Sequence, residues 1–234
     1  QSERCPLTDM KTSGKITEIF SSVQGEGIYF GEEQIFVRFF GCNLKCKFCD
    51  THLDRFTEYE PEELLQELKL YKNGHATVSF TGGEPLLQKY FLKAILKLTR
   101  QEGYKNYLET NGILHSALED VIDDVDIVAM DLKLPSSTGL KDFWYHHRRF
   151  LKVASKKETF LKMVICQDTN EEDLKEGLRL IKEVNKFLIL VLQPNSYEEY
   201  EPMIEKLERF KDIARDNHIT ACVIPQLHKK IGVK

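Results

Sequence analysis

The stretch ATVSFTGGEPLLQKYFLKAILKL, residues 76–98, decides the fold class. Its first part, residues 76–81, reads ATVSFT, contains the apolar residues Ala76, Val78 and Phe80, and is predicted to be a strand. The turn TGGEP follows at 81–85, and apolar residues then recur with the 3.6-residue period of an amphipathic helix. These helical positions are Leu86, Leu87, Tyr90, Phe91, Ala94, Ile95 and Leu98. The stretch is therefore a strand, a turn and a helix in succession.

The same unit recurs along the chain. A second helix is predicted after Pro61, a good first-turn residue, with Gly74 as its stop signal. Further strands are predicted at 35–40, 104–109, 126–131, 159–165, 187–192 and 219–224. Strands that alternate with helices, about six times here, give an α/β fold with a parallel sheet, either doubly wound or curled into a barrel.

Composition limits the domain organisation and the class of partner. The 234 residues contain no Pro/Gly/Ser-rich linker, so we expect a single domain over 15–234, with 1–14 a tag remnant or flexible tail. The net charge of -4 argues against nucleic acid as a partner. The apolar run FLILVL at 187–192 is far shorter than the roughly 20 residues that span a bilayer, so no membrane is expected.

Polar, glycine-rich motifs follow the ends of the predicted strands. They are the cysteine loop after 35–40, TGGEP after 76–81, ETNG (109–112) after 104–109, DLKLPSSTG (131–139) after 126–131, and QPN (193–195) after 187–192. In parallel α/β folds the chemistry lies at the carboxyl ends of the strands. We therefore expect the five motifs to meet on one face.

The cysteine loop, GCNLKCKFCDTH at 41–52, spaces Cys42, Cys46 and Cys49 as C-x3-C-x2-C. With His52 these thiols could form a Cys3His zinc site, and packed structural thiols are a further alternative. Three thiolates with no fourth cysteine nearby also suit a [4Fe–4S] cluster with one open iron. The other cysteines, Cys5, Cys166 and Cys222, are scattered along the chain, so we do not expect a disulfide framework. We expect the protein to be located in the reducing cytoplasm.

The cysteine spacing, the aromatic Phe48 before the last cysteine and the GGEP motif together resemble the radical S-adenosylmethionine (SAM) superfamily. The resemblance implies a partial (β/α)6 barrel, a [4Fe–4S] cluster on Cys42, Cys46 and Cys49, and SAM bound at the open iron. It also implies an electron donor such as flavodoxin or ferredoxin. The SAM-binding residues that it implies are Phe48, Gly82, Gly83, Glu84, Glu109, Asn111, Lys133, Ser136 and Gln193.

The segment ITEIFSSVQGEGIYFGEEQIFVRFFGCNLKCKFCDT, residues 16–51, resembles the 7-carboxy-7-deazaguanine synthase family. That family carries QGEG, F-V-R, the cysteine loop and Asp-Thr after the last cysteine. The resemblance implies a homodimer and the substrate 6-carboxy-5,6,7,8-tetrahydropterin, with Arg38 for its carboxylate and Thr51 as a Mg²⁺ ligand. The substrate-binding residues are then Gln24, Gly25, Glu26, Arg38, Thr81, Gln226 and His228, and the catalytic ones Arg38 and Thr51.

Alternative functions remain open at this point. The segment MDLKLPSSTGLKDFWYHH, residues 130–147, departs from the Ser-Pro-Lys pattern of many synthases. A queuine lyase, which would convert queuine to 7-aminomethyl-7-deazaguanine, is the nearest sibling activity. A glycyl-radical-enzyme activase and a zinc-stabilised binding module are the other two. His146 and His147, next to two arginines, are interpreted as a solvated helix face.

Overall fold

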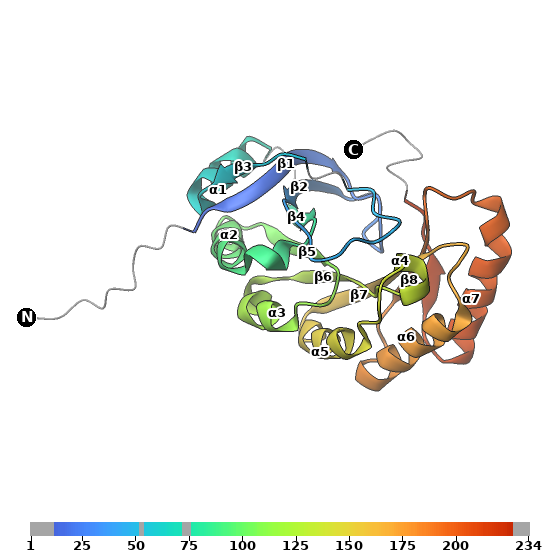
Figure 1. Cartoon of the computed structure of the whole chain (residues 1–234). Helices are drawn as coiled ribbons and strands as arrows, with labels where there is room; N and C mark the ends of the chain where they lie inside the picture. The colour runs from blue at the N-terminus through green and yellow to red at the C-terminus, as the bar shows by residue number, and fades with distance from the viewer. Residues whose placement is uncertain (1–11, 52–53, 72–75, 227–234) are drawn as a thin grey trace, which may run out of the picture.

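The computed structural model describes residues 12–51, 54–71 and 76–226, and these form one curved sheet with helices along its outer side (Figure 1). In this part of the chain nine strands follow the order β3-β1-β2-β4-β5-β6-β7-β8-β9. They are β1 (Gly14–Val23), β2 (Glu33–Phe39), β3 (Thr57–Tyr59), β4 (Thr77–Gly82), β5 (Lys105–Thr110), β6 (Ile127–Asp131), β7 (Glu158–Ile165), β8 (Leu190–Pro194) and β9 (Ala221–Val223).

The helices follow the strands in alternation. They are α1 (Pro61–Leu70), α2 (Lys89–Gln101), α3 (His115–Val121), α4 (Pro135–Thr138), α5 (Trp144–Ala154), α6 (Glu171–Val184) and α7 (Ile204–Asp216), with 3-10 turns η1 (Pro85–Gln88), η2 (Ile122–Asp124) and η3 (Glu201–Met203). None of the helices in the described residues has the length and apolar character that a membrane crossing needs.

Strands β2 and β4 to β9 pair in parallel, which confirms the predicted α/β class, and the open curved sheet is a partial barrel. Strands β1 and β3 extend it in the antiparallel sense and were not predicted. The prediction for 187–192 was wrong at its start, because β8 begins at Leu190. Phe187 instead lies in a turn, where its backbone amide donates to the side-chain oxygen of Asn185, and the residue is 83% exposed.

The sheet has an apolar core on each side. The larger core lies between strands and helices, and a smaller one fills the inside of the barrel. The inner core contains Tyr107, Ile127, Ala129, Phe160 and Val191, and Tyr29 packs on it. Side chains of a strand alternate between faces, so further inward-facing positions lie beyond this core, toward the carboxyl ends of the strands. These positions are polar and are occupied by Arg38, Thr81, Glu109, Asp131, Lys162 and Gln193, with Arg38 beside Thr81 and Asp131 beside Lys162 in the strand register.

Candidate active site

A cavity of about 590 Å³ opens at the carboxyl ends of the strands, above the inner apolar core. All five motifs predicted to meet on one face contribute residues to its wall, which confirms that prediction. The segment between β1 and β2 and the residue Gln226 after β9 contribute as well. The volume lies in the range that encloses a small organic ligand.

The TGGEP turn is shaped by close backbone contact with the end of β2. The amide of Gly83 donates to the carbonyl of Phe39 at 3.0 Å, and the amide of Glu84 donates to that of Gly41 at 2.9 Å. At Gly82 the φ angle is +115°, and a Cβ atom there would lie 2.4 Å from the backbone of Phe39. Only glycine therefore fits, and the turn presents its backbone to the cavity.

Glu84 is fully buried and does not line the cavity. Its carboxylate accepts hydrogen bonds from the amides of Leu86 and Asn111 and from the hydroxyl of Thr110. Burial raises the pKa of Glu84 to about 7, against the lowering effect of these donors. Glu84, a residue of the TGGEP turn, is therefore hydrogen-bonded to the ETNG turn. The ETNG turn places Asn111 on the cavity wall.

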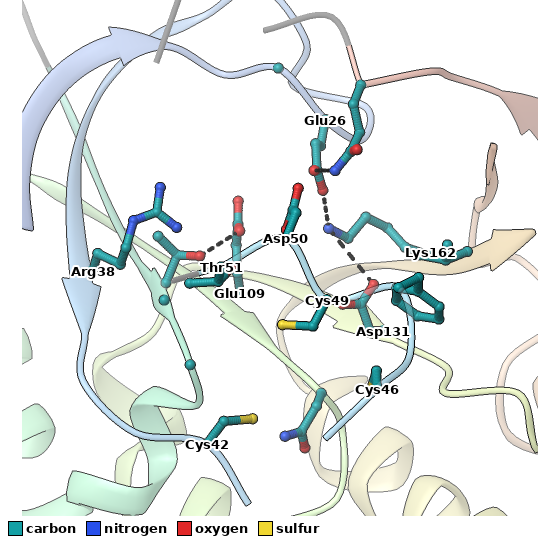
Figure 2. Close-up of a pocket in the computed structure, with 18 of the residues that line it drawn as sticks. Glu26, Arg38, Cys42, Cys46, Cys49, Asp50, Thr51, Glu109, Asp131 and Lys162 are labelled. Atoms are coloured by element: carbon teal, nitrogen blue, oxygen red, sulfur yellow. Dashed lines mark hydrogen bonds and ion pairs between the residues drawn. The ribbon is translucent and has the colours of Figure 1, made fainter. Parts of the chain in front are cut away.

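The three cysteines of the loop all line the cavity (Figure 2). Burial raises the pKa of the Cys42 and Cys46 thiols, so an electropositive group is needed to hold them as thiolates. In the part of the chain that the structure describes, no three Cys, His, Asp or Glu side chains lie close enough to bind one metal ion. A cluster does not require the three sulfurs at a single ion, because each thiolate binds a different iron. His52, the possible fourth zinc ligand, lies outside the described residues.

A chain of alternating charges crosses the cavity wall (Figure 2). The ammonium of Lys162 lies 2.5 Å from the Glu26 carboxylate and 3.7 Å from that of Asp131. Lys133 bonds the other oxygen of Asp131 at 2.9 Å, and its ammonium lies 5.4 Å from the Phe48 ring centroid. Burial alone would raise the pKa of Glu26, but Lys162 and the hydrogen bonds from Lys162 and Gln226 lower it to about 2.

Two hydrogen bonds to a carboxylate and one further ion pair lie on the opposite wall. Glu109 accepts from the hydroxyl of Thr81 at 2.8 Å and from the side-chain amide of Gln24 at 2.9 Å. The Nε of Arg38 lies 3.5 Å from Glu18, and its guanidinium carbon is 5.5 Å from the centroid of the Phe20 ring. Arg38 is thus oriented by two contacts that leave it on the cavity wall.

Most residues predicted for the site lie on this cavity. These are Gln24, Gly25, Glu26, Arg38, Cys42, Cys46, Phe48, Cys49, Thr51, Thr81, Gly82, Gly83, Glu109, Asn111, Lys133, Gln193 and Gln226. Ser136 does not line it: its amide donates to Asp173 and its hydroxyl accepts from the amide of Asn170. His228 lies outside the described residues. Lys162 was missed, although a lysine inside the apolar run TFLKMVI was a usable signal.

His147 contradicts the interpretation as a solvated face, because its side chain is fully buried. Its Nε2 accepts from the amide of Lys133 at 3.1 Å, and its Nδ1 lies 3.0 Å from the carbonyl of Gly112. Burial lowers its pKa to about 4, which keeps the ring neutral. The signal was its position three and four residues before Phe150 and Leu151, on the apolar side of α5. His147 holds together two loops that carry cavity residues.

Comparison with known proteins gives concordant results. The family model described as Radical SAM superfamily matches residues 36–207. A 7-carboxy-7-deazaguanine synthase of Geobacter sulfurreducens is 34% identical, over 95% of this chain and 98% of that protein. One of Thermoplasma acidophilum is 36% identical, over 92% and 96%. The crystal structure of QueE from Escherichia coli aligns over 90% of this chain and 93% of that one, with a TM-score of 0.63 and 21% identity, a likeness of fold.

Proposed function

Since the chain belongs to the radical SAM superfamily, and within it to the 7-carboxy-7-deazaguanine synthase family, we propose that it converts 6-carboxy-5,6,7,8-tetrahydropterin to 7-carboxy-7-deazaguanine. Membership of the superfamily implies a [4Fe–4S] cluster and SAM. The observation that carries the proposal is one cavity that joins the three cysteines to Arg38 and to the QGEG segment. A cofactor side and a carboxylate-binding side thus face the same space.

The residues present fit the cofactors. Cys42, Cys46 and Cys49 would hold the cluster, and the bare backbone of the TGGEP turn would bind the methionyl part of SAM. The buried Oε1 of Gln193 has no hydrogen-bond partner among the described residues, which supports a role as acceptor for a bound ligand. When bound, the cluster and SAM supply the means to abstract a hydrogen atom from a carbon of the substrate.

The remaining cofactor residues divide into two groups. Phe48, Glu109, Asn111 and Lys133 lie on the cavity wall, within the same space as the TGGEP turn, and would contact SAM directly. Glu84 and Ser136 lie behind the wall, where their hydrogen bonds hold the loops that follow β5 and β6. For these two residues we propose a positioning role.

On the substrate side, the predicted residues that line the cavity have roles that their positions support. Arg38 would bind the substrate carboxylate with its guanidinium fork. Thr51 would provide a hydroxyl ligand to Mg²⁺, an ion that takes few protein ligands and keeps waters or substrate oxygens. Gln24, Gly25, Glu26, Thr81 and Gln226 would surround the ring system. A flavodoxin or ferredoxin as electron donor, a homodimer and a cytoplasmic location belong to the same proposal.

An anaerobic assay tests the proposed function. The reconstituted chain should contain about four irons and four sulfides and be brown, and Cys46→Ala should abolish both the colour and SAM cleavage. With reductant, SAM and Mg²⁺ it should convert the carboxytetrahydropterin, and Thr51→Ala should weaken the response to Mg²⁺. Queuine is assayed in parallel. Conversion of queuine with no reaction of the carboxytetrahydropterin would establish the lyase instead.

A further inference from the structure

Lys162 occupies an unusual position for a lysine. It lies near the middle of β7, points into the barrel and has a side chain only 6% exposed. Removing an ammonium from water is energetically costly, and a well-packed apolar residue usually stabilises such a position better. The neighbouring inward residue Phe160 is apolar, as expected for a barrel core. A charge kept at this position therefore indicates recognition or chemistry rather than stability.

The protonation states of Lys162 and Glu26 are fixed by their surroundings. Burial alone would lower the pKa of Lys162, but Asp131 and Glu26 hold it well above its usual value. Glu26 has a low pKa for the reasons given above. At neutral pH, Lys162 is therefore a donor only and Glu26 an acceptor only. The two charged groups lie side by side, 2.5 Å apart, on the cavity wall.

Both groups retain capacity for a ligand. An ammonium has three N–H donors, and within the described residues Glu26 is its one hydrogen-bond acceptor, since Asp131 at 3.7 Å is an ion-pair partner only. The Glu26 carboxylate accepts one bond from Lys162 and one from the side-chain amide of Gln226. Two ionised oxygens offer about four lone-pair positions, so acceptor sites remain.

We propose that Lys162 and Glu26 together recognise the lactam edge of the bicyclic substrate. Lys162 donates to the ring carbonyl oxygen, and Glu26 accepts from the adjacent ring N–H and the exocyclic amine. This inference rests on the proposed function, because that edge, C=O, N–H and C–NH₂ in sequence, is shared by the pterin substrate and the deazaguanine product. Lys162 as a donor next to Glu26 as an acceptor matches that order of groups. A ligand edge with a donor facing Lys162 and an acceptor facing Glu26 would be disfavoured.

The position of Arg38 supports this orientation of the substrate. Figure 2 shows Arg38 on one side of the cavity and the Lys162–Glu26 pair on the opposite side. A 6-carboxypterin carries its carboxylate at the end of the bicycle opposite the lactam. Arg38 is thus placed for the carboxylate when the pair holds the lactam edge. Lys162 is a specificity residue in this arrangement.

The test compares two ligands that differ at the lactam edge. One is 6-carboxypterin and the other is 2-aminopteridine-6-carboxylate, which lacks the carbonyl oxygen and the ring N–H. Binding to the SAM-loaded holoenzyme is followed by pterin fluorescence under anaerobic conditions. The unmodified enzyme should prefer 6-carboxypterin by about 100-fold, since loss of hydrogen bonds to charged groups leaves both charges unpaired.

Two variants and a control variant test whether this preference depends on Lys162 and Glu26. Lys162→Gln should reduce the preference for 6-carboxypterin to less than about tenfold while SAM still binds. The double variant Glu26→Gln/Lys162→Gln, in which both members of the buried pair are neutral, should do the same. Lys157→Gln, where the ammonium bonds the carbonyl of Asp123 at an exposed site just before β7, should keep the full preference. Equal weakening of both ligands with an unchanged preference would overturn the inference. Failure of the unmodified enzyme to convert the carboxytetrahydropterin would instead overturn the proposed function.

Discussion

At the scale of single residues, His147 makes the site sensitive to acid. An unfolded histidine has a pKa near 6.5, and burial lowers that of His147 to about 4. The unfolded state therefore binds more protons between these values, and the stability that the neutral ring contributes is lost as pH falls from 6.5 toward 4. Glu84, with its pKa raised by burial to about 7, acts in the opposite direction over an overlapping range.

We expect His147→Gln to destabilise the chain more at pH 7.5 than at pH 5. The difference should be about 2 kcal/mol, because at pH 5 the unmodified chain already loses that amount by keeping the ring neutral. Urea unfolding of the cluster-free protein at both values measures it, and the Glu84 contribution cancels between the two proteins. The exposed neighbour His146, changed to Gln, serves as the control. A pH-independent cost for His147→Gln would contradict the assigned neutral ring.

Arg38→Ala should weaken the substrate far more than SAM. Loss of a charge-assisted contact to a carboxylate should reduce substrate affinity by about 10- to 100-fold, as for other hydrogen bonds to charged groups. SAM affinity should change by no more than about twofold, the scatter expected of separate sites. Equilibrium binding of both ligands to the holoenzyme measures this. Glu18→Gln, which leaves the guanidinium but removes its partner at 3.5 Å, should have a smaller effect. Equal weakening of both ligands would remove Arg38 from the carboxylate site.

These residues also show the limits of sequence interpretation. The cysteines were found because their residue type and spacing carry chemistry in themselves, and Gly82 and Arg38 because they lie in motifs that resemble those of a known family. For Lys162 and His147 the sequence signal is limited to their position in an apolar pattern. Their roles depend on burial against particular partners, Glu26 for Lys162 and Gly112 for His147. Those partners come from distant parts of the chain. Only the tertiary structure brings them together.

At the scale of elements, the turn after β4 is the most constrained connection of the site. Gly82→Ala should cost about 3 kcal/mol, since it combines a positive φ with a Cβ atom forced against the backbone of Phe39. Gly103→Ala is the matched control, with a φ of +84° but open space around its Cβ position, and should cost about 1 kcal/mol. Denaturant unfolding measures both. SAM binding should fall only in Gly82→Ala, and similar costs for the two variants would show that space at Gly82 is unimportant.

The parallel strands were predictable and the antiparallel ones were not, for a physical reason. Strands such as β6 are buried on both faces, so their sequences are continuous apolar runs. In β1, GKITEIFSSV, only two of ten residues are buried, and its polar side chains resemble those of a loop. Strand β3 has three residues and none of them is buried. The pattern of hydrophobic residues therefore identifies a strand only where the strand is covered.

At the scale of the whole molecule, the cavity is enclosed by two segments that are far apart in the sequence. The QGEG segment lies between β1 and β2, and residues 224–226 follow β9 at the other end of the sheet. A hydrogen bond from the Gln226 side chain to Glu26 connects them over 200 positions. The tight turn at Gly27, where a Cβ atom would lie 2.5 Å from the ring of Phe160, fixes the first segment on the inner core.

We therefore expect the two segments to respond to ligand as one unit. Addition of 6-carboxypterin at ten times its Kd should slow amide exchange in residues 24–31 and 221–226 by about tenfold, because ligand binding suppresses their local opening. Amides in the middle of β4 to β7 should exchange slowly with or without ligand. Hydrogen exchange with mass spectrometry on the holoenzyme measures these rates. Gln226→Ala should leave protection in 24–31 and lose it in 221–226, whereas protection of one segment alone in the unmodified protein would show that they close independently.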